Sequence, residues 1–208
     1  MRTFVINCDG SEDRWEKYTD KKYERWAGTH WKELPDGDPR FKKMVSYHNI
    51  NPNEHKAKVG CLVSHTNLWR YIVCNKMNDI LILEDDAVEV GSVPENLPTD
   101  GVTYLGGLFW NLKTLDGPKK ISLENGIYLV DDFKIMMALS YYFPTWEIAK
   151  ELLDYVESQK RLRALDIMMP KAPCTFYISY PGSYEEKGDQ SLIRNKKNKR
   201  SNKYYQWV

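Results

Sequence analysis

The sequence has no long hydrophobic run and almost no net charge, and each absence excludes a class of protein. No apolar stretch approaches the ~20 residues that a membrane-spanning helix needs, and the first residues lack the apolar segment of a signal peptide. The formal net charge is +1 over 208 residues, which gives no indication of binding to nucleic acid or to a membrane surface. We therefore expect a cytoplasmic, monomeric protein, either whole or as one domain of a longer chain.

Cysteine and histidine are scarce, and their spacing predicts no zinc site. The cysteines form no CxxC pair and no Cys/His metal spacing; they are Cys8, Cys61, Cys74 and Cys174. The histidines are scattered along the chain; they are His30, His48, His55 and His65. We expect reduced, mostly buried thiols, and we expect His65 to be a hydrogen-bonded core or supporting residue rather than a catalyst.

What the chain does contain suits one α/β domain with a real core. Hydrophobic residues make up 42% of the sequence, and we expect the domain to span residues 1–193. Residues 194–203 hold six cations and no acid. We interpret 194–208 as a solvated tail or linker, with a role in holding a phosphorylated ligand as the alternative.

The most informative stretch is 79–87, where four aliphatic residues run directly into three carboxylates. The aliphatic run behind Asn78-Asp79 predicts a strand buried on both faces, as in a parallel sheet. Alternation places Glu84 and Asp86 on one face of this strand and Asp85 on the other. Open α/β sheets bind ligands at the carboxyl ends of their strands.

Three adjacent carboxylates at such a position repel one another unless a cation or several donors lie there. Glu84 and Asp86 would form an oxygen clamp for Mg²⁺ or Mn²⁺ carrying a phosphate group, with Asp86 as the first ligand. The alternative is a strand that runs into an acidic, solvated turn.

Around this stretch, helical and strand patterns alternate along the chain. Strands are predicted at 3–7, 102–105, 135–142 and 174–180, and antiparallel hairpins within 108–142 are indicated by Asp116-Gly117 and Asn125-Gly126. Helical patterns cover 12–26, 59–76 and a segment after Thr145, which we expect to cap it. A turn is predicted at 35–39, and residues 165–168 are helix or loop.

Several motifs, in order, resemble glycosyltransferase family 25, the lipopolysaccharide and collagen sugar transferases. Val5–Arg14 resembles the opening strand and turn of the family, Val59–Trp69 its "G-C-x-x-S-H" helix, and Leu81–Asp86 its "I-L-E-D-D" metal strand. Segments 138–153, 165–166 and 177–191 are similar to later family motifs, whereas 106–134 has no clear counterpart. The compact length, the many aromatic residues and the basic run at 194–203 also resemble the amino-terminal domain of chlorovirus capsid-glycosylating enzymes.

The resemblance implies a GT-A fold, which is a mostly parallel sheet flanked by helices with added antiparallel hairpins. It also implies a UDP-sugar donor, Mn²⁺ or Mg²⁺, and a glycan or glycoprotein acceptor. A divalent ion held by carboxylates would stabilise the charge that develops on the leaving diphosphate.

Further site candidates come from the residues near these motifs. For the donor we name Ile6, Asn7 and Arg14 from the first strand and turn, Gly60 and Ser64 from a helix start, and Glu84 and Asp85 from the acidic run. Asn7 as a simple turn-former, Arg14 as an exposed helix charge, and ordinary helix-start chemistry for Gly60 and Ser64 are the alternatives.

A general base or acceptor ligand is expected at Asp166, which stands in an apolar run, with a helix cap as the competing explanation. Asp189 is the next candidate, in a Gly-containing loop with Lys187 that would order over the donor. Two other functions stay open, namely a metal-dependent phosphoesterase and a non-catalytic carbohydrate-binding module.

Overall fold

The computed structural model describes residues 1–20, 22–45, 52–111, 126–130 and 133–186. Its centre is a seven-stranded sheet in the order β2-β1-β3-β7-β5-β8-β6. The strands are β1 (Arg2–Cys8), β2 (Tyr23–Gly28), β3 (Ile80–Glu84), β5 (Gly101–Asn111), β6 (Gly126–Leu129), β7 (Phe133–Phe143) and β8 (Thr175–Tyr180). A small antiparallel sheet pairs β4 (Ala87–Glu89) with β9 (Tyr184–Glu186).

Most strands of the large sheet run in one direction. β2, β1 and β3 are mutually parallel, β5 and β8 share their direction, and only β7 and β6 run the opposite way. The α/β architecture with a mostly parallel sheet and antiparallel additions is therefore confirmed, and it is compatible with a GT-A fold.

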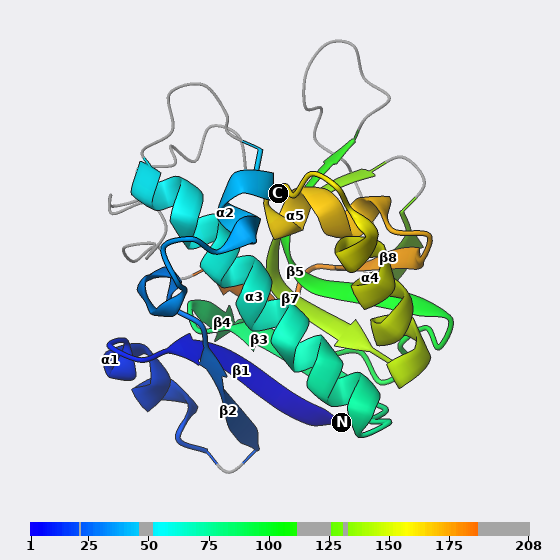
Figure 1. Cartoon of the computed structure of the whole chain (residues 1–208). Helices are drawn as coiled ribbons and strands as arrows, with labels where there is room; N and C mark the ends of the chain where they lie inside the picture. The colour runs from blue at the N-terminus through cyan, green and yellow to red at the C-terminus, as the bar shows by residue number, and fades with distance from the viewer. Residues whose placement is uncertain (21, 46–51, 112–125, 131–132, 187–208) are drawn as a thin grey trace.

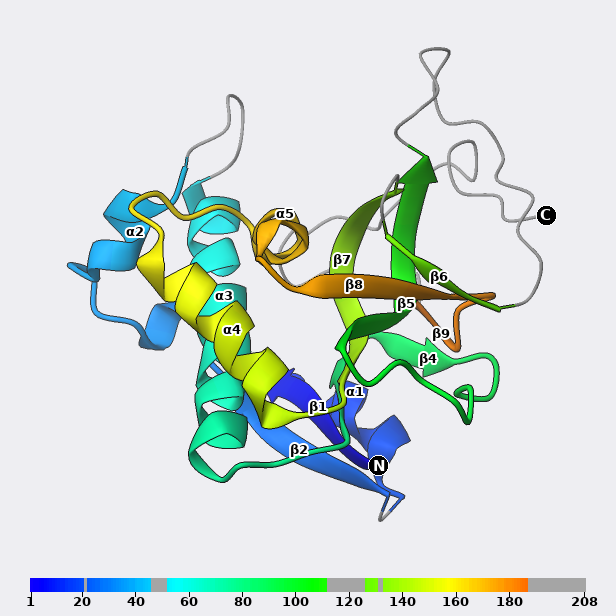
Figure 2. The same cartoon turned by 90° about the vertical axis from the view of Figure 1, so that its right-hand side faces the viewer.

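The strands β3 and β1 separate two hydrophobic layers. Ile80 and Ile82 pack into the larger cluster beneath the helices α3 (Pro52–Cys74) and α4 (Trp146–Ser158), which lie side by side on one face of the sheet (Figures 1 and 2). Leu81 and Leu83 pack into a smaller cluster on the other face, with Tyr18 from the 3-10 helix η1 (Glu16–Tyr18). All four aliphatic side chains are at most 1% exposed, so the predicted strand buried on both faces is confirmed.

The first helical prediction was too long. The segment 12–26 forms only α1 (Glu12–Trp15) and η1 before it turns into β2. β2 pairs in parallel with β1 from Thr3↔Tyr23 to Cys8↔Gly28. Mixed charge made this segment resemble a helix, whereas pairing with β1 decides its conformation, since a strand partner outweighs a weak local preference.

Short helices form on either side of the predicted turn at 35–39. The region 29–57 contains η2 (Trp31–Glu33), α2 (Pro39–Lys43) and the first turns of α3. The predicted turn at 35–39 is present, with Asp38 N donating to Pro35 O at 2.9 Å. Asp38 then caps α2, whose first residue is Pro39, a favourable residue at that position.

The later elements follow the predictions closely. β7 ends at Phe143 before Pro144, and α4 buries Ile148, Leu152, Leu153 and Val156. Thr145 is the residue before α4, but its side chain makes no capping hydrogen bond. Residues 165–168 form the short helix α5 (Leu165–Met168), which η3 (Met169–Lys171) continues.

The expectation for the cysteines was only partly correct. All four are free thiols, but Cys74 is exposed and the other three are half-buried, so none is fully buried. The predictions for Asp116-Gly117, Lys187, Asp189 and the tail 194–208 concern residues outside the described ranges. Within the described ranges, no helix combines the length and apolarity that crossing a bilayer requires.

Candidate functional site

The candidate site lies where β3 ends. The three carboxylates at this position have three different surroundings. Glu84 is the last residue of β3, whereas Asp85 and Asp86 form the turn that leads into β4. Tyr18, from the smaller hydrophobic cluster, stabilises this turn because its hydroxyl donates to Ala87 O. Asp86 is therefore not in the strand, and the expected shared face of Glu84 and Asp86 applies to the strand only up to Glu84.

Asp85 is tied to the first strand and the first helix. Asn7 Nδ2 donates to Asp85 Oδ2 and Arg14 donates to Asp85 Oδ1, each at 2.9 Å. Burial raises the pKa of Asp85, and the neighbouring Arg14 guanidinium counteracts that rise. Asp85 thus has structural donors on the strand face opposite Glu84.

The side chain of Asn7 is fully buried, and both its amide nitrogen and its amide oxygen are hydrogen-bonded to protein atoms. Its Nδ2 also donates to Ser11 O at 2.9 Å, and its Oδ1 accepts from Arg25 Nε at 2.9 Å. Arg25, which sequence reasoning did not single out, also reaches Asp9 at 2.8 Å. Asn7 consequently shapes the turn between β1 and α1 and positions Asp85.

Asp86 lies in the most unfavourable electrostatic surroundings of the three. Its Oδ1 is buried and has no hydrogen-bond partner within the described part of the chain. Burial, together with the charges of Glu84, Asp85 and Glu186, raises the pKa of Asp86 to about 8. A carboxylate of this kind requires a proton or a cation.

Glu186 is a fourth acid that the sequence did not reveal. It lies 100 residues from Asp86 in the chain, and the pairing of β9 with β4 places it opposite Ala87. No local motif marks it, because only the antiparallel register brings it to the turn.

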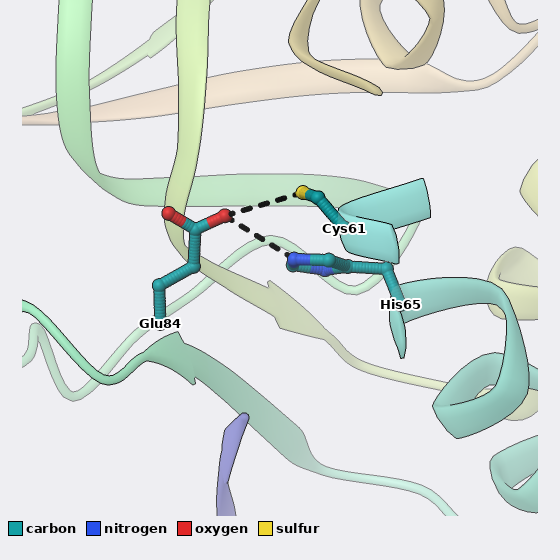
Figure 3. Close-up of side chains that lie close together, drawn as sticks. All are labelled: Cys61, His65 and Glu84. Carbon is teal, nitrogen blue, oxygen red and sulfur yellow. Dashed lines mark hydrogen bonds and ion pairs between the residues drawn. The ribbon is translucent and has the colours of Figure 1, made fainter. Parts of the chain in front are cut away.

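Glu84 points to the α3 side, where it meets a histidine and a thiol (Figure 3). His65 Nε2 lies 3.2 Å from Glu84 Oε1, and Cys61 Sγ lies 3.9 Å from the same oxygen. His65 Nδ1 lies 2.7 Å from the hydroxyl of Tyr141, which also accepts from Trp69 Nε1 at 2.8 Å. His65 is 1% exposed, so its expected place as a hydrogen-bonded core residue is confirmed.

Gly60 and Ser64 are not at a helix start, contrary to the prediction. α3 begins at Pro52, so both residues lie in its middle, where backbone N–H groups are already used within the helix. Ser64 Oγ donates to Gly60 O and accepts from Thr29 N, each at 2.8 Å. A Cβ on Gly60 would lie 2.9 Å from Thr29 O, so this glycine permits close packing of α3 on the chain before η2.

Asp166 occupies the first turn of α5 and is half-buried. The N-cap of α5 is Ala164, so the helix-cap explanation for Asp166 is wrong. Its Oδ2 accepts from Met137 N at 3.4 Å, and Met137 has a φ of 75°, which is unusual for a residue other than glycine. Strained backbone of this kind clusters at functional sites.

The charges of Glu84 and Asp166 meet around Cys61. Burial raises the pKa of the Cys61 thiol well above its usual value, and the carboxylates of Glu84 and Asp166 raise it further. Asp166 also contributes to the raised pKa of Tyr104. Glu84, Cys61 and Asp166 therefore share one region between β3, α3 and α5.

Of the remaining predicted residues, Ile6 is a buried core residue whose Cα lies in register with that of Glu84. Because its side chain is buried, Ile6 could contact a ligand only through its backbone.

A hollow of about 550 Å³ is present between segments 91–96 and 179–182, and none of the three carboxylates lines it. The site is therefore defined by the carboxylates at the end of β3.

The sequence search missed the pairing of Cys61 with His65. The signal was present, because residues four apart lie on the same face of a helix. This spacing differs from CxxC and from the usual Cys/His metal spacings, and nothing in the local sequence indicates that Glu84 faces the pair.

Residues 1–93 match the sequence model of glycosyltransferase family 25 (LPS biosynthesis protein). The matched segment contains β1, α3 and β3, and hence Asn7, Arg14 and the three carboxylates. A search of curated proteins found no match to the chain.

Proposed function

We propose, from the premise that the chain is a glycosyltransferase resembling family 25, that it uses a UDP-sugar donor with Mn²⁺ or Mg²⁺. Asp86 would hold the ion, with Glu84 beside it, and the sugar would pass to a glycan or glycoprotein acceptor. The reaction would be of the hexosyltransferase type.

The single observation that carries the metal proposal is the buried Oδ1 of Asp86, which has no hydrogen-bond partner among the described residues and is surrounded by the charges of Glu84, Asp85 and Glu186. Four carboxylates at one turn accumulate negative charge that Arg14 only partly balances. Carboxylate oxygens are the ligands that Mg²⁺ and Mn²⁺ prefer, so the donor set suits the ion that this chemistry needs.

The side chains around the turn would have different roles, some structural and some in binding the ion. Asn7 and Arg14 hold Asp85, which fixes the turn and leaves Asp86 available to the ion. When bound, the ion supplies Lewis-acid stabilisation of the negative charge on the departing diphosphate. Arg14 lies beside the same turn and would contribute a second positive charge near the diphosphate.

Asp166 is our candidate for the group that accepts the proton of the acceptor hydroxyl. It belongs to the same region as Glu84 and lies on the side of the sheet that α3 and α5 cover. Removal of a proton from the hydroxyl would make its oxygen a better nucleophile toward the anomeric carbon. Asp189 stays the second candidate, outside the described residues.

Ligand-dependent melting tests this proposal against its alternatives. We expect a large rise in melting temperature only with UDP and Mn²⁺ together, because two phosphates would otherwise face unscreened carboxylates. A chelator should weaken UDP binding at least tenfold, about 1.4 kcal/mol. Asp86→Asn should lose this metal-dependent part of UDP binding and lose turnover with it.

Equal UDP affinity with and without chelator would contradict the metal proposal. A response to metal with no preference for UDP would favour a phosphoesterase, and a response to free sugar alone would favour a carbohydrate-binding module. Slow hydrolysis of a panel of UDP-sugars would then identify the donor.

A further inference from the structure

We propose that Cys61, His65 and Glu84 form a second metal site, which takes a thiophilic divalent cation such as Zn²⁺. The three ligand atoms face one another across α3 and β3 (Figure 3). Glu84 would be common to this site and to the ion site proposed at Asp86, whereas Cys61 and His65 belong to this site alone. A nitrogen, a sulfur and a carboxylate oxygen are the three ligand types that proteins offer to zinc.

The distances from Glu84 to the other two ligand atoms are close to the spacing that one small ion requires. Bonds of about 2.0–2.3 Å at tetrahedral angles place neighbouring ligand atoms about 3.3–3.6 Å apart. Here His65 Nε2 and Glu84 Oε1 are 3.2 Å apart, Cys61 Sγ and Glu84 Oε1 are 3.9 Å apart, and all three ligand atoms lie within 4.8 Å of one another. Shifts of a few tenths of an ångström would therefore suffice for Glu84 to share an ion with each of the other two ligands.

Two elements of the fold place these ligands before any ion arrives. Cys61 and His65 are four residues apart in the middle of the 23-residue helix α3, so their side chains project from the same face. Glu84 ends β3, whose preceding residues are fully buried. Both elements are held rigidly by the larger hydrophobic cluster, and a preformed site loses little entropy on binding.

Tyr141 and Trp69 provide the outer support that metal-binding histidines usually have. The Tyr141 hydroxyl contacts His65 Nδ1 at 2.7 Å and is itself held by Trp69 Nε1 at 2.8 Å. This contact fixes the imidazole ring and directs Nε2 at Glu84. For Nε2 to offer its lone pair to the ion, the ring proton must be on Nδ1, from which it is donated to the Tyr141 oxygen.

The charge of the site is also suitable. Cys61 loses its thiol proton to solvent as the Zn–S bond forms, so thiolate and carboxylate together neutralise the two positive charges of the ion. Three protein ligands leave a fourth position for water or another small ligand. The sulfur and nitrogen ligands separate this site from the all-oxygen site at Asp86, which favours harder ions.

Cobalt absorption tests the proposal, since Co²⁺ replaces Zn²⁺ and reports its ligands. One equivalent of Co²⁺ added to the metal-free full-length protein, with no nucleotide present, should give an intense near-ultraviolet thiolate-to-cobalt band. Stoichiometric Zn²⁺ should abolish the band. Cys61→Ser should lack it, and His65→Gln should weaken Co²⁺ binding at least tenfold.

The other thiols provide matched controls. Cys74→Ser removes the exposed cysteine and Cys8→Ser removes a half-buried one near Cys61, and both should keep the band. Tyr141→Phe removes only the outer hydroxyl, and it should keep the band while weakening Co²⁺ affinity about 10–100-fold. Unchanged affinity would show that the hydroxyl does not support the ligand.

Three outcomes would overturn the site: no thiolate band in the wild type, a band that survives Cys61→Ser, or a band lost in Cys74→Ser or Cys8→Ser. Cys61→Ser is nearly isosteric, so it tests the site even if His65→Gln does not fold. Because nucleotide is absent, failure here is independent of the UDP measurements. Conversely, metal-independent UDP binding would contradict the ion site at Asp86 but not the site at Cys61 and His65, which the cobalt band tests.

Discussion

Arg14 and Asp85 form an ion pair with a 2.9 Å contact between residues 71 positions apart, and it joins α1 to the turn after β3. Both side chains are largely buried, at 15% and 10% exposure. The pair therefore serves the architecture of the site as well as its charge, and Arg14 is not the exposed helix charge that was the alternative.

Replacement of Arg14 should cost stability as well as ligand affinity. Asp85 accepts hydrogen bonds from the side chains of Asn7 and Arg14, and Arg14→Ala leaves only that of Asn7. Because the Asp85 carboxylate is buried, we expect a loss of at least about 1.5 kcal/mol in the free energy of unfolding. Urea denaturation measures this loss. If Arg14 also contacts the donor, UDP affinity should fall in the same variant.

Asp85→Asn provides the matched control for that experiment. In the double variant Arg14→Ala/Asp85→Asn, no unpaired buried charge is left, and it should be more stable than Arg14→Ala alone. If the stability loss of the double variant equals the sum of the losses in Arg14→Ala and Asp85→Asn, the two residues have no energetic coupling.

The metal-free protein should lose stability as the pH rises. The pKa of Asp86 is raised to about 8 by burial and by neighbouring acids, above its unfolded value near 3.8. Between these two values the folded state binds more protons than the unfolded state, so stability falls with increasing pH and the loss is complete above about pH 8.

Asp86→Asn should remove this pH dependence. In the absence of metal at pH 8.5, the variant should be more stable than the wild type by at least about 1 kcal/mol, or about 2–4 °C in melting temperature. At pH 4 the two proteins should melt together. Melting curves across pH with chelator present make the comparison, and a pH-independent difference would contradict the assignment.

Asp166→Asn should separate binding from chemistry. The amide keeps an oxygen that accepts from Met137 N, so the fold and UDP binding should be preserved. Transfer should fall on the order of 10²–10⁴-fold if Asp166 is the general base. If this variant transfers sugar at the wild-type rate, Asp166 is not the general base, and Asp189 becomes the next candidate.

Gly60→Ala should show that this glycine serves packing. Its Cβ would lie 2.9 Å from Thr29 O and 3.0 Å from Trp31 N, both backbone atoms, so we expect a loss of about 1–3 kcal/mol. Gly37→Ala is the control, because nothing lies within 4 Å of its added Cβ. Equal stability of the two variants would mean that α3 has room to shift.

Much of the architecture was determined by local sequence. The four aliphatic residues at 80–83 indicated a strand buried on both faces, because successive side chains of a strand point to opposite faces and all four are apolar. The stripe of Ile148, Leu152, Leu153 and Val156 likewise required a helix on an apolar surface. The carboxylates at the end of β3 marked the site for the same reason, since three adjacent charges after a buried strand need partners.

Only the tertiary structure decided which partners those charges have. Asp85 is bound by Asn7 and Arg14, and Glu84 faces His65 and Cys61, whereas Asp86 lies near a further acid, Glu186, from the β4–β9 pair. Neighbours along the chain separate in space because a strand directs successive side chains to opposite faces and a turn redirects the next. Their partners come from distant segments whose register is set by sheet pairing and helix packing, and local sequence does not encode that register.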